Sequence, residues 1–154
     1  MSEVGDLIAP GAVCVRLGAV TRKQVIQAMS ERLARVTGLD PKKLAEAVMV
    51  RERVAGTGIG HGVALPHAQI DGLAAPICAV AQLETPVNFD ALDGLGADLV
   101  VLLVSPPAGK AAHLKALARL ARMLRRPETR ERLRAARGPE DMLACLAAQA
   151  VNAA

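Results

Sequence analysis

The six residues Leu99-Val100-Val101-Leu102-Leu103-Val104 carry the strongest strand signal in the chain. They are apolar without interruption, which is typical of a strand covered on both faces. Residues 77–83, Ile-Cys-Ala-Val-Ala-Gln-Leu, predict a second, mostly buried strand, which Glu84-Thr85-Pro86 is expected to end. A sheet containing such strands needs helices on both of its faces.

Helical segments alternate with these strands. Leucines at helical spacing predict a long helix over about residues 110–126. On the N-terminal side, Thr21 is placed as the N-cap and Gly38 as the C-terminal stop of a first helix. Asp40-Pro41 then starts a second helix, which we expect to reach about Glu52.

The remaining segments complete the pattern. We expect a polar lead-in at residues 2–11, a short strand at 13–17 and an irregular or edge segment at 88–94. Two short helices are expected at residues 127–133 and 139–148. Strands that alternate with helices predict an α/β fold in which one sheet is covered on both faces. A chain of 154 residues is long enough to bury a core and is most simply one domain.

The composition excludes several classes of protein. The chain has one Phe and no Trp or Tyr, which counts against single-stranded nucleic-acid binding, because bases usually stack on aromatic side chains. No stretch approaches the roughly 18–20 apolar residues of a membrane span, and no signal peptide opens the chain. Cys14, Cys78 and Cys145 are far apart, which favours buried free thiols in a reducing compartment. We expect a soluble, cytoplasmic protein without membrane insertion.

Positive charge is concentrated in residues 115–137, which hold nine Lys or Arg and only two Glu, against a net charge of +4 for the whole chain. A solvated helical face is the simplest interpretation. A docking surface for an acidic protein partner is the alternative.

The most unusual stretch is Arg51-Glu52-Arg53-Val54-Ala55-Gly56-Thr57-Gly58-Ile59-Gly60-His61-Gly62-Val63-Ala64-Leu65-Pro66-His67. It lacks the Gly-Lys-Ser/Thr of a Walker A loop and does not fit G-x-G-x-x-G, so neither nucleotide motif is supported. Glycine at alternate positions predicts a backbone surface that a ligand or partner can approach, although a flexible loop is the alternative. His67 is expected where a strand ends.

The histidines suggest a chemistry. A neutral imidazole such as that of His67 can accept a phosphoryl group, given donors for the phosphoryl oxygens and a guanidinium, for which Arg51 and Arg53 are candidates. His113 falls on the buried leucine stripe of its helix, either as a core histidine bonded to a carbonyl or as a second imidazole facing His67. No compact metal-ligand spacing and no G-x-S-x-G serine motif is present. Neither a metal site nor a serine hydrolase is therefore predicted.

Three blocks of residues resemble a known family. They are Gly56-Thr57-Gly58-Ile59-Gly60-His61-Gly62-Val63-Ala64-Leu65-Pro66-His67, Gln82-Leu83-Glu84-Thr85-Pro86-Val87-Asn88-Phe89-Asp90-Ala91 and Ala112-His113-Leu114. Together with Arg51-Glu52 they resemble the fructose/mannitol-type EIIA domain of the bacterial phosphotransferase system, and most closely its nitrogen-regulatory branch (PtsN, EIIA-Ntr). The resemblance covers nearly the whole chain, and it implies one EIIA domain over about residues 4–150.

The resemblance also implies a mixed sheet with helices on both sides and a set of roles. His67 matches the residue that accepts a phosphoryl group from an HPr-like phosphohistidine carrier (NPr). Arg51 matches the arginine near that histidine, and His113 the supporting imidazole. Such a protein is a phosphotransferase component rather than a self-contained enzyme, and it needs no cofactor or metal. His61 and Ala68-Gln69 depart from the family pattern, which bears on rate and partner preference.

Three functions remain open on this basis. The first is a regulator whose phosphorylation state sets which target proteins it binds. The second is a stand-alone EIIA of a sugar transport system that passes phosphate to an EIIB. The third is a binding regulator that no longer carries phosphate, against which the presence of all three matching site residues argues.

Overall fold

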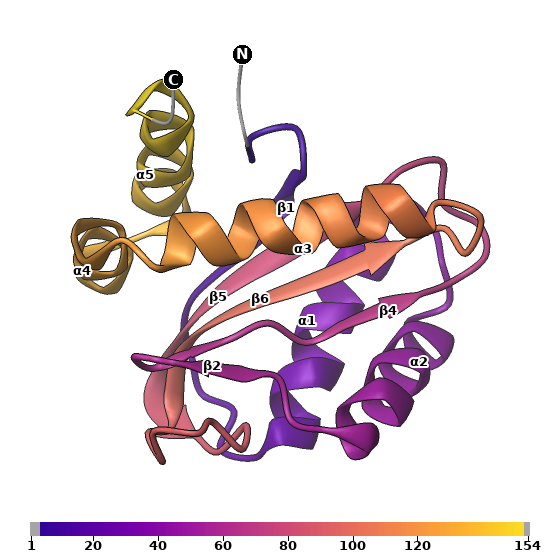
Figure 1. Cartoon of the computed structure of the whole chain (residues 1–154), viewed down its shortest axis with the longest axis horizontal. Helices are drawn as coiled ribbons and strands as arrows, with labels where there is room; N and C mark the ends of the chain where they lie inside the picture. Colours follow the sequence, from indigo (N-terminus) through magenta and orange to yellow (C-terminus); the bar gives the residue numbers. More distant parts are fainter. Residues whose placement is uncertain (1–3, 153–154) are drawn as a thin grey trace.

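The computed structural model describes residues 4–152 and shows one mixed β-sheet between two layers of helices (Figure 1). The strands run in the order β1-β5-β6-β3-β2, with β4 also paired to β6. Their bounds are β1 Ile8–Leu17, β2 Gly58–Gly60, β3 Val63–Ala64, β4 His67–Gln69, β5 Ile77–Val87 and β6 Ala97–Ser105. β5 and β6 are antiparallel, whereas β1 pairs parallel to β5, and β3 and β4 pair parallel to β6. The expected mixed sheet is confirmed.

Two groups of helices cover the sheet, as expected. α1 (Arg22–Thr37) and α2 (Pro41–Val54) pack on one face. α3 (Lys110–Leu124), α4 (Pro127–Ala135) and α5 (Pro139–Asn152) lie on the other (Figure 1). None of the helices in the described part of the chain is long and apolar enough to cross a membrane.

The central strand β6 is apolar over residues 99–104 because its side chains enter a core on each face of the sheet. Successive side chains of a strand point to opposite faces. Val100, Leu102 and Val104 accordingly enter the core beneath α1 and α2. Leu99, Val101 and Leu103 enter the core beneath α3, α4 and α5. One run of six apolar residues therefore joins two cores.

The predicted caps of the first two helices are confirmed. The hydroxyl of Thr21 accepts a hydrogen bond from the backbone N–H of Gln24 at 3.1 Å. Gly38 ends α1 with a left-handed φ of 79°, and its N–H donates to the carbonyl of Ala34. Asp40 caps α2 by accepting from the N–H of Lys42 at 2.9 Å. Gly38 and Asp40 thus fix the loop between the two helices.

Two predicted strand bounds are wrong. β1 already begins at Ile8, inside the expected lead-in, because a register shift before Val13 accommodates the proline and glycine between them. β5 continues through the expected break to Val87, again with a register shift after Gln82 that absorbs the proline. Proline interrupts a ladder only where its missing N–H would be needed, and a bulge removes that need.

Candidate active site

His67 follows the end of β3, as expected, and is itself the first residue of a further short strand, β4, which the sequence did not predict. Leu65 and Pro66 separate β3 from β4, and both short strands pair with β6. The carbonyl of Pro66 accepts a hydrogen bond from the N–H of Leu103, which keeps the interrupted edge aligned. His67 is the register partner of Leu103, so its side chain leaves the sheet on the face covered by α3.

The backbone fixes the tautomer of His67. Its Nδ1 lies 2.8 Å from the carbonyl oxygen of Leu65. A carbonyl can only accept, so Nδ1 carries the hydrogen and Nε2 keeps its lone pair. Nε2 is therefore the nucleophilic atom of this ring.

His113 stands beside His67. It lies in the first turn of α3, is 7% exposed, and occupies the buried stripe that the leucine spacing predicted. The two ring centroids are 5.5 Å apart and the rings are inclined by 51°. Nδ1 of His113 lies 2.7 Å from Oγ of Ser105, a side chain rather than a backbone carbonyl. Of the two possibilities left open by the sequence, the structure shows the imidazole adjacent to His67.

The two histidines share an open depression of about 460 Å³ with Arg51. Its other lining residues are Ala47, Val50, Val54, Ala68, Gln69, Lys110, Leu114 and Leu117. Arg51 lies in the last turn of α2, and its Nη1 donates to the carbonyl of Ala55 at 2.9 Å. The structure thus brings together the three residues that the family resemblance implied.

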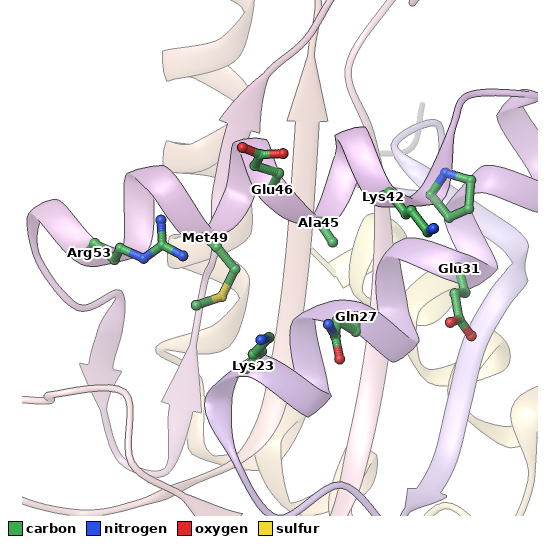
Figure 2. Close-up of a pocket in the computed structure, with 9 residues that line it drawn as sticks. Lys23, Gln27, Glu31, Lys42, Ala45, Glu46, Met49 and Arg53 are labelled. Atoms are coloured by element: carbon green, nitrogen blue, oxygen red, sulfur yellow. The ribbon is translucent and has the colours of Figure 1, made fainter.

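The second guanidinium candidate, Arg53, lies elsewhere. Figure 2 shows it on the side of α2 that borders α1, in a groove that Lys23 and Met49 also line. Side chains two positions apart in a helix point about 200° away from each other, so Arg51 and Arg53 cannot lie on the same face of α2. Arg53 is therefore not part of the site with His67.

Burial keeps both imidazoles neutral. Desolvation is the main cause that lowers the pKa of His67, and the positive charge of Arg51 lowers it further. The hydrogen bond to Leu65 and the charge of Glu52 act in the opposite direction. Burial also lowers the pKa of His113, and the proximity of His67 adds to this. Nε2 of His67 is consequently unprotonated at neutral pH.

The glycines do not form the predicted ligand-facing surface. A Cβ on Gly56 would come within 2.4 Å of the carbonyl oxygen of Phe89, and one on Gly58 within 2.8 Å of the Cβ of Ala91. The N–H of Gly58 also donates to the carbonyl of Phe89. The missing side chains of Gly56 and Gly58 make room for a neighbouring loop of the same chain, so the expectation of a surface open to a ligand or partner is wrong there.

His61 also lies away from the site. With Gly62 it forms the turn between β2 and β3, and both residues have positive φ, 58° and 78°, as tight hairpin turns require. Its N–H donates to the carboxylate of Asp93 at 2.8 Å. His61 lines a separate depression with Arg134 and not the one that holds His67. Of the departures from the family pattern, only Ala68 and Gln69 border the site.

Two residues that support the site, Glu52 and Ser105, were given no role from the sequence. Glu52 is 2% exposed and accepts from Oγ1 of Thr57 at 2.6 Å and from its N–H at 3.0 Å, which ties the glycine stretch to the end of α2. Ser105 ends β6 and bonds His113. The alternation of side chains along a strand could have identified Ser105. It is two residues after Leu103, so its side chain lies on the same face of β6, which α3 covers.

The basic segment is partly structural. Arg130 is buried, and its Nη1 donates to the carbonyls of Leu124 and Arg125 at the end of α3. Arg134 pairs with Asp98 at 3.0 Å. Other basic side chains of the segment, such as Arg132, are exposed. The basic segment therefore includes one arginine that joins α4 to α3 and one that joins α4 to β6.

The described residues contain no group of three or more His, Cys, Asp or Glu arranged to hold a metal ion. All three cysteines are free and buried, as predicted. Burial raises the pKa of the Cys14 and Cys145 thiols and that of Cys78 even further. These thiols are therefore inert packing groups.

Relatives and solved structures agree with this fold. Residues 7–149 match the family described as phosphoenolpyruvate-dependent sugar phosphotransferase system, EIIA 2. The chain is 36% identical to the nitrogen regulatory protein of Bradyrhizobium diazoefficiens over 151 residues, covering 98% of this chain and 99% of the relative. It is also 36% identical to the nitrogen regulatory protein of Escherichia coli, covering 82% of this chain and 78% of that one.

The structural comparison gives the same result. The nitrogen regulatory protein IIA-Ntr of Neisseria meningitidis superposes with a TM-score of 0.86 at 28% identity, covering 94% of this chain and 99% of that chain. The mannitol IIA of Escherichia coli shares the fold with a TM-score of 0.74 at 22% identity, over 90% of this chain and 98% of that one. With its family match, its relatives and its fold in agreement, the chain belongs to the EIIA type 2 family of the phosphotransferase system, and it is similar to the nitrogen regulatory proteins of that family.

Proposed function

We propose that the chain is a phosphocarrier and regulatory protein of the nitrogen-related phosphotransferase system. Nε2 of His67 accepts a phosphoryl group from a phosphohistidine on an HPr-like carrier (NPr), and the resulting phosphorylation state regulates partner proteins. The observation that carries the proposal is the hydrogen bond from Nδ1 of His67 to the Leu65 carbonyl, which leaves Nε2 as a neutral nucleophile beside His113 and Arg51.

The transfer balances without a base or a cofactor. The Nε2 lone pair attacks phosphorus, the bond between phosphorus and the donor nitrogen breaks, and the donor ring leaves with that electron pair. Nδ1 of His67 keeps its hydrogen, so positive charge develops on the ring as the new bond forms. The Leu65 carbonyl, which accepts from Nδ1, stabilises that charge.

Arg51 and His113 are the side chains that bind the oxygens of the phosphoryl group. The three equatorial oxygens of the moving group carry negative charge and need positive or hydrogen-bonding partners. Arg51 provides a guanidinium at the wall of the depression that holds His67. The ring of His113, 5.5 Å from that of His67 between centroids, is close enough to contact a group held on Nε2.

Exposed apolar side chains at the rim of the depression indicate that the phosphoryl donor is a protein. Val50 and Val54 on α2 are 53% and 79% exposed, and Leu114 on α3 is 56% exposed. All three line the depression, so apolar side chains surround the polar site on two sides. Exposed apolar groups around a polar centre are typical of a surface that another protein covers.

Phosphotransfer in vitro tests the proposal. The chain is incubated with phosphoenolpyruvate, enzyme I and an NPr-type carrier, and the label on the protein is measured. We expect an acid-labile, base-stable phosphate on the wild type and none on His67→Ala. His61→Ala is the matched control, since it removes a histidine of the adjoining hairpin, and it should take label like the wild type. Label on His67→Ala contradicts the proposal.

Sugar transport is the second candidate. The family description names a sugar system, and a mannitol IIA in complex with phosphorylated IIB shares this fold, with a TM-score of 0.77 at 20% identity. Two relatives that match along most of both chains are nitrogen regulatory proteins, which supports the regulatory role. Fast, stoichiometric transfer from the labelled protein to a fructose- or mannitol-type EIIB would favour transport; retention of the label would favour regulation.

A further inference from the structure

Ser105 is placed to control the second imidazole. It is the last residue of β6 and is 0% exposed, and its Oγ lies 2.7 Å from Nδ1 of His113. Within residues 4–152, this is the one hydrogen bond made by the hydroxyl. The strand fixes the position of Ser105, and the first turn of α3 fixes that of His113. The contact therefore joins two rigid elements.

The direction of this hydrogen bond follows from counting protons. A hydroxyl always has one hydrogen to donate, and a buried donor without an acceptor is costly. If Nδ1 of His113 donated to Oγ, the hydroxyl hydrogen of Ser105 would have no acceptor among the described residues. If the hydroxyl donates to Nδ1 instead, both atoms are satisfied. Nδ1 then bears the lone pair, and the ring hydrogen is on Nε2.

We propose that Ser105 is a positioning residue that holds His113 in the Nε2–H tautomer, opposite to the Nδ1–H tautomer of His67. The inference rests on the proposed phosphoryl transfer to His67. One ring then offers a lone pair to phosphorus and the other offers an N–H to a phosphoryl oxygen. With the other tautomer, His113 would present a lone pair to negatively charged oxygens, which repels them.

Nitrogen-15 NMR of the imidazole side chains tests the tautomer directly. In the unphosphorylated wild type we expect Nδ1 of His113 to be unprotonated and hydrogen-bonded, and Nε2 to be protonated, with the reverse for His67. A protonated Nδ1 on His113 overturns the proposal. The spectrum is independent of phosphotransfer, so failure of the proposed function, seen as label on His67→Ala, remains distinguishable.

Substitution tests the positioning role. Ser105→Ala should slow phosphoryl acceptance about tenfold, the effect of one ordinary hydrogen bond, while KM for the carrier is unchanged. The Nδ1 resonance of His113 should move at the same time. Ser105→Thr keeps the hydroxyl and should restore both the rate and the resonance.

Ser30→Ala is the matched control. Ser30 is also 0% exposed, but its hydroxyl has no hydrogen-bond partner among residues 4–152, and it lies on α1, which covers the opposite face of the sheet. The control should leave transfer unchanged. If Ser105→Ala transfers as fast as Ser30→Ala, Ser105 does not position the ring, even where the wild-type spectrum shows the expected tautomer.

Discussion

The rings of His67 and His113 are neighbours, 5.5 Å apart between centroids, but they are held by opposite kinds of partner. A carbonyl, which can only accept, bonds Nδ1 of His67, and a hydroxyl, which can donate, bonds Nδ1 of His113. With the tautomer proposed for His113, two identical side chains become chemically different. Neither partner is itself a titrating group, so the difference is built into the fold.

Arg51 should act on the transition state rather than on folding. In the proposed mechanism Arg51 stabilises the charge of the moving phosphoryl group, so Arg51→Ala is expected to slow phosphoryl acceptance about 100-fold. Arg53→Ala is the matched control, since it removes the same charge from the same helix but from the groove shown in Figure 2. Rates from quenched-flow labelling check the pair. Equal rates for the two variants would remove Arg51 from the site.

His113 should matter less than His67 for acceptance. His113→Ala leaves the nucleophile and its Leu65 hydrogen bond in place, so we expect slowed but measurable labelling, whereas His67→Ala should take none. Labelling time courses at one carrier concentration compare the two variants, with circular dichroism as the check on folding. Damage in His113→Ala equal to or greater than that in His67→Ala reverses the assigned roles.

Both histidines should make the protein less stable in acid. Burial lowers the pKa of each ring in the folded state below the ordinary 6.5. The unfolded chain then binds more protons below that pH, so stability is fully present above pH 6.5 and declines as pH falls through the lowered values. Urea unfolding between about pH 7.5 and pH 5 measures the slope. The double variant His67→Ala/His113→Ala should show a smaller slope, and an equal slope refutes this explanation.

Adding a side chain at Gly58 should reduce the stability of the fold, because the glycine makes room for a neighbouring loop and not for a phosphate. Gly58→Ala places a Cβ within 2.8–3.0 Å of Ala91 and should cost about 1–3 kcal/mol of stability through overpacking. Gly18→Ala is the control, because its Cβ would meet only a side-chain oxygen of Glu84 at 3.7 Å. Thermal unfolding compares the two. A destabilised Gly18→Ala beside an unaffected Gly58→Ala would contradict the packing role.

The basic segment should divide into structural and dispensable arginines. Arg130→Ala leaves the carbonyls of Leu124 and Arg125 without their donor and should cost about 1–3 kcal/mol of stability. Arg132, two residues further along α4, is exposed, and Arg132→Ala should change stability by less than about 0.5 kcal/mol. Chemical denaturation measures both. If both variants unfold alike, the buried arginine does not cap α3.

Much of the fold could be predicted because its signals are local. The caps Thr21, Gly38 and Asp40 act within a few residues of themselves, and they lie where the sequence predicted. The start of β1 at Ile8 could not be predicted, since its proline and glycine are tolerated only through a bulge against β5. A bulge depends on the partner strand, which the local sequence does not specify.

For the site, the residue types could be predicted from the sequence: an imidazole after a proline at His67, a second on a buried stripe at His113, and basic side chains near the end of α2. The folded structure was needed to choose between Arg51 and Arg53, to show that Gly56 and Gly58 face Phe89 and Ala91, and to place the Ser105 hydroxyl on His113. The physical reason is that helical and strand periodicity fixes the face on which a side chain lies, while the group it meets there comes from a distant part of the chain.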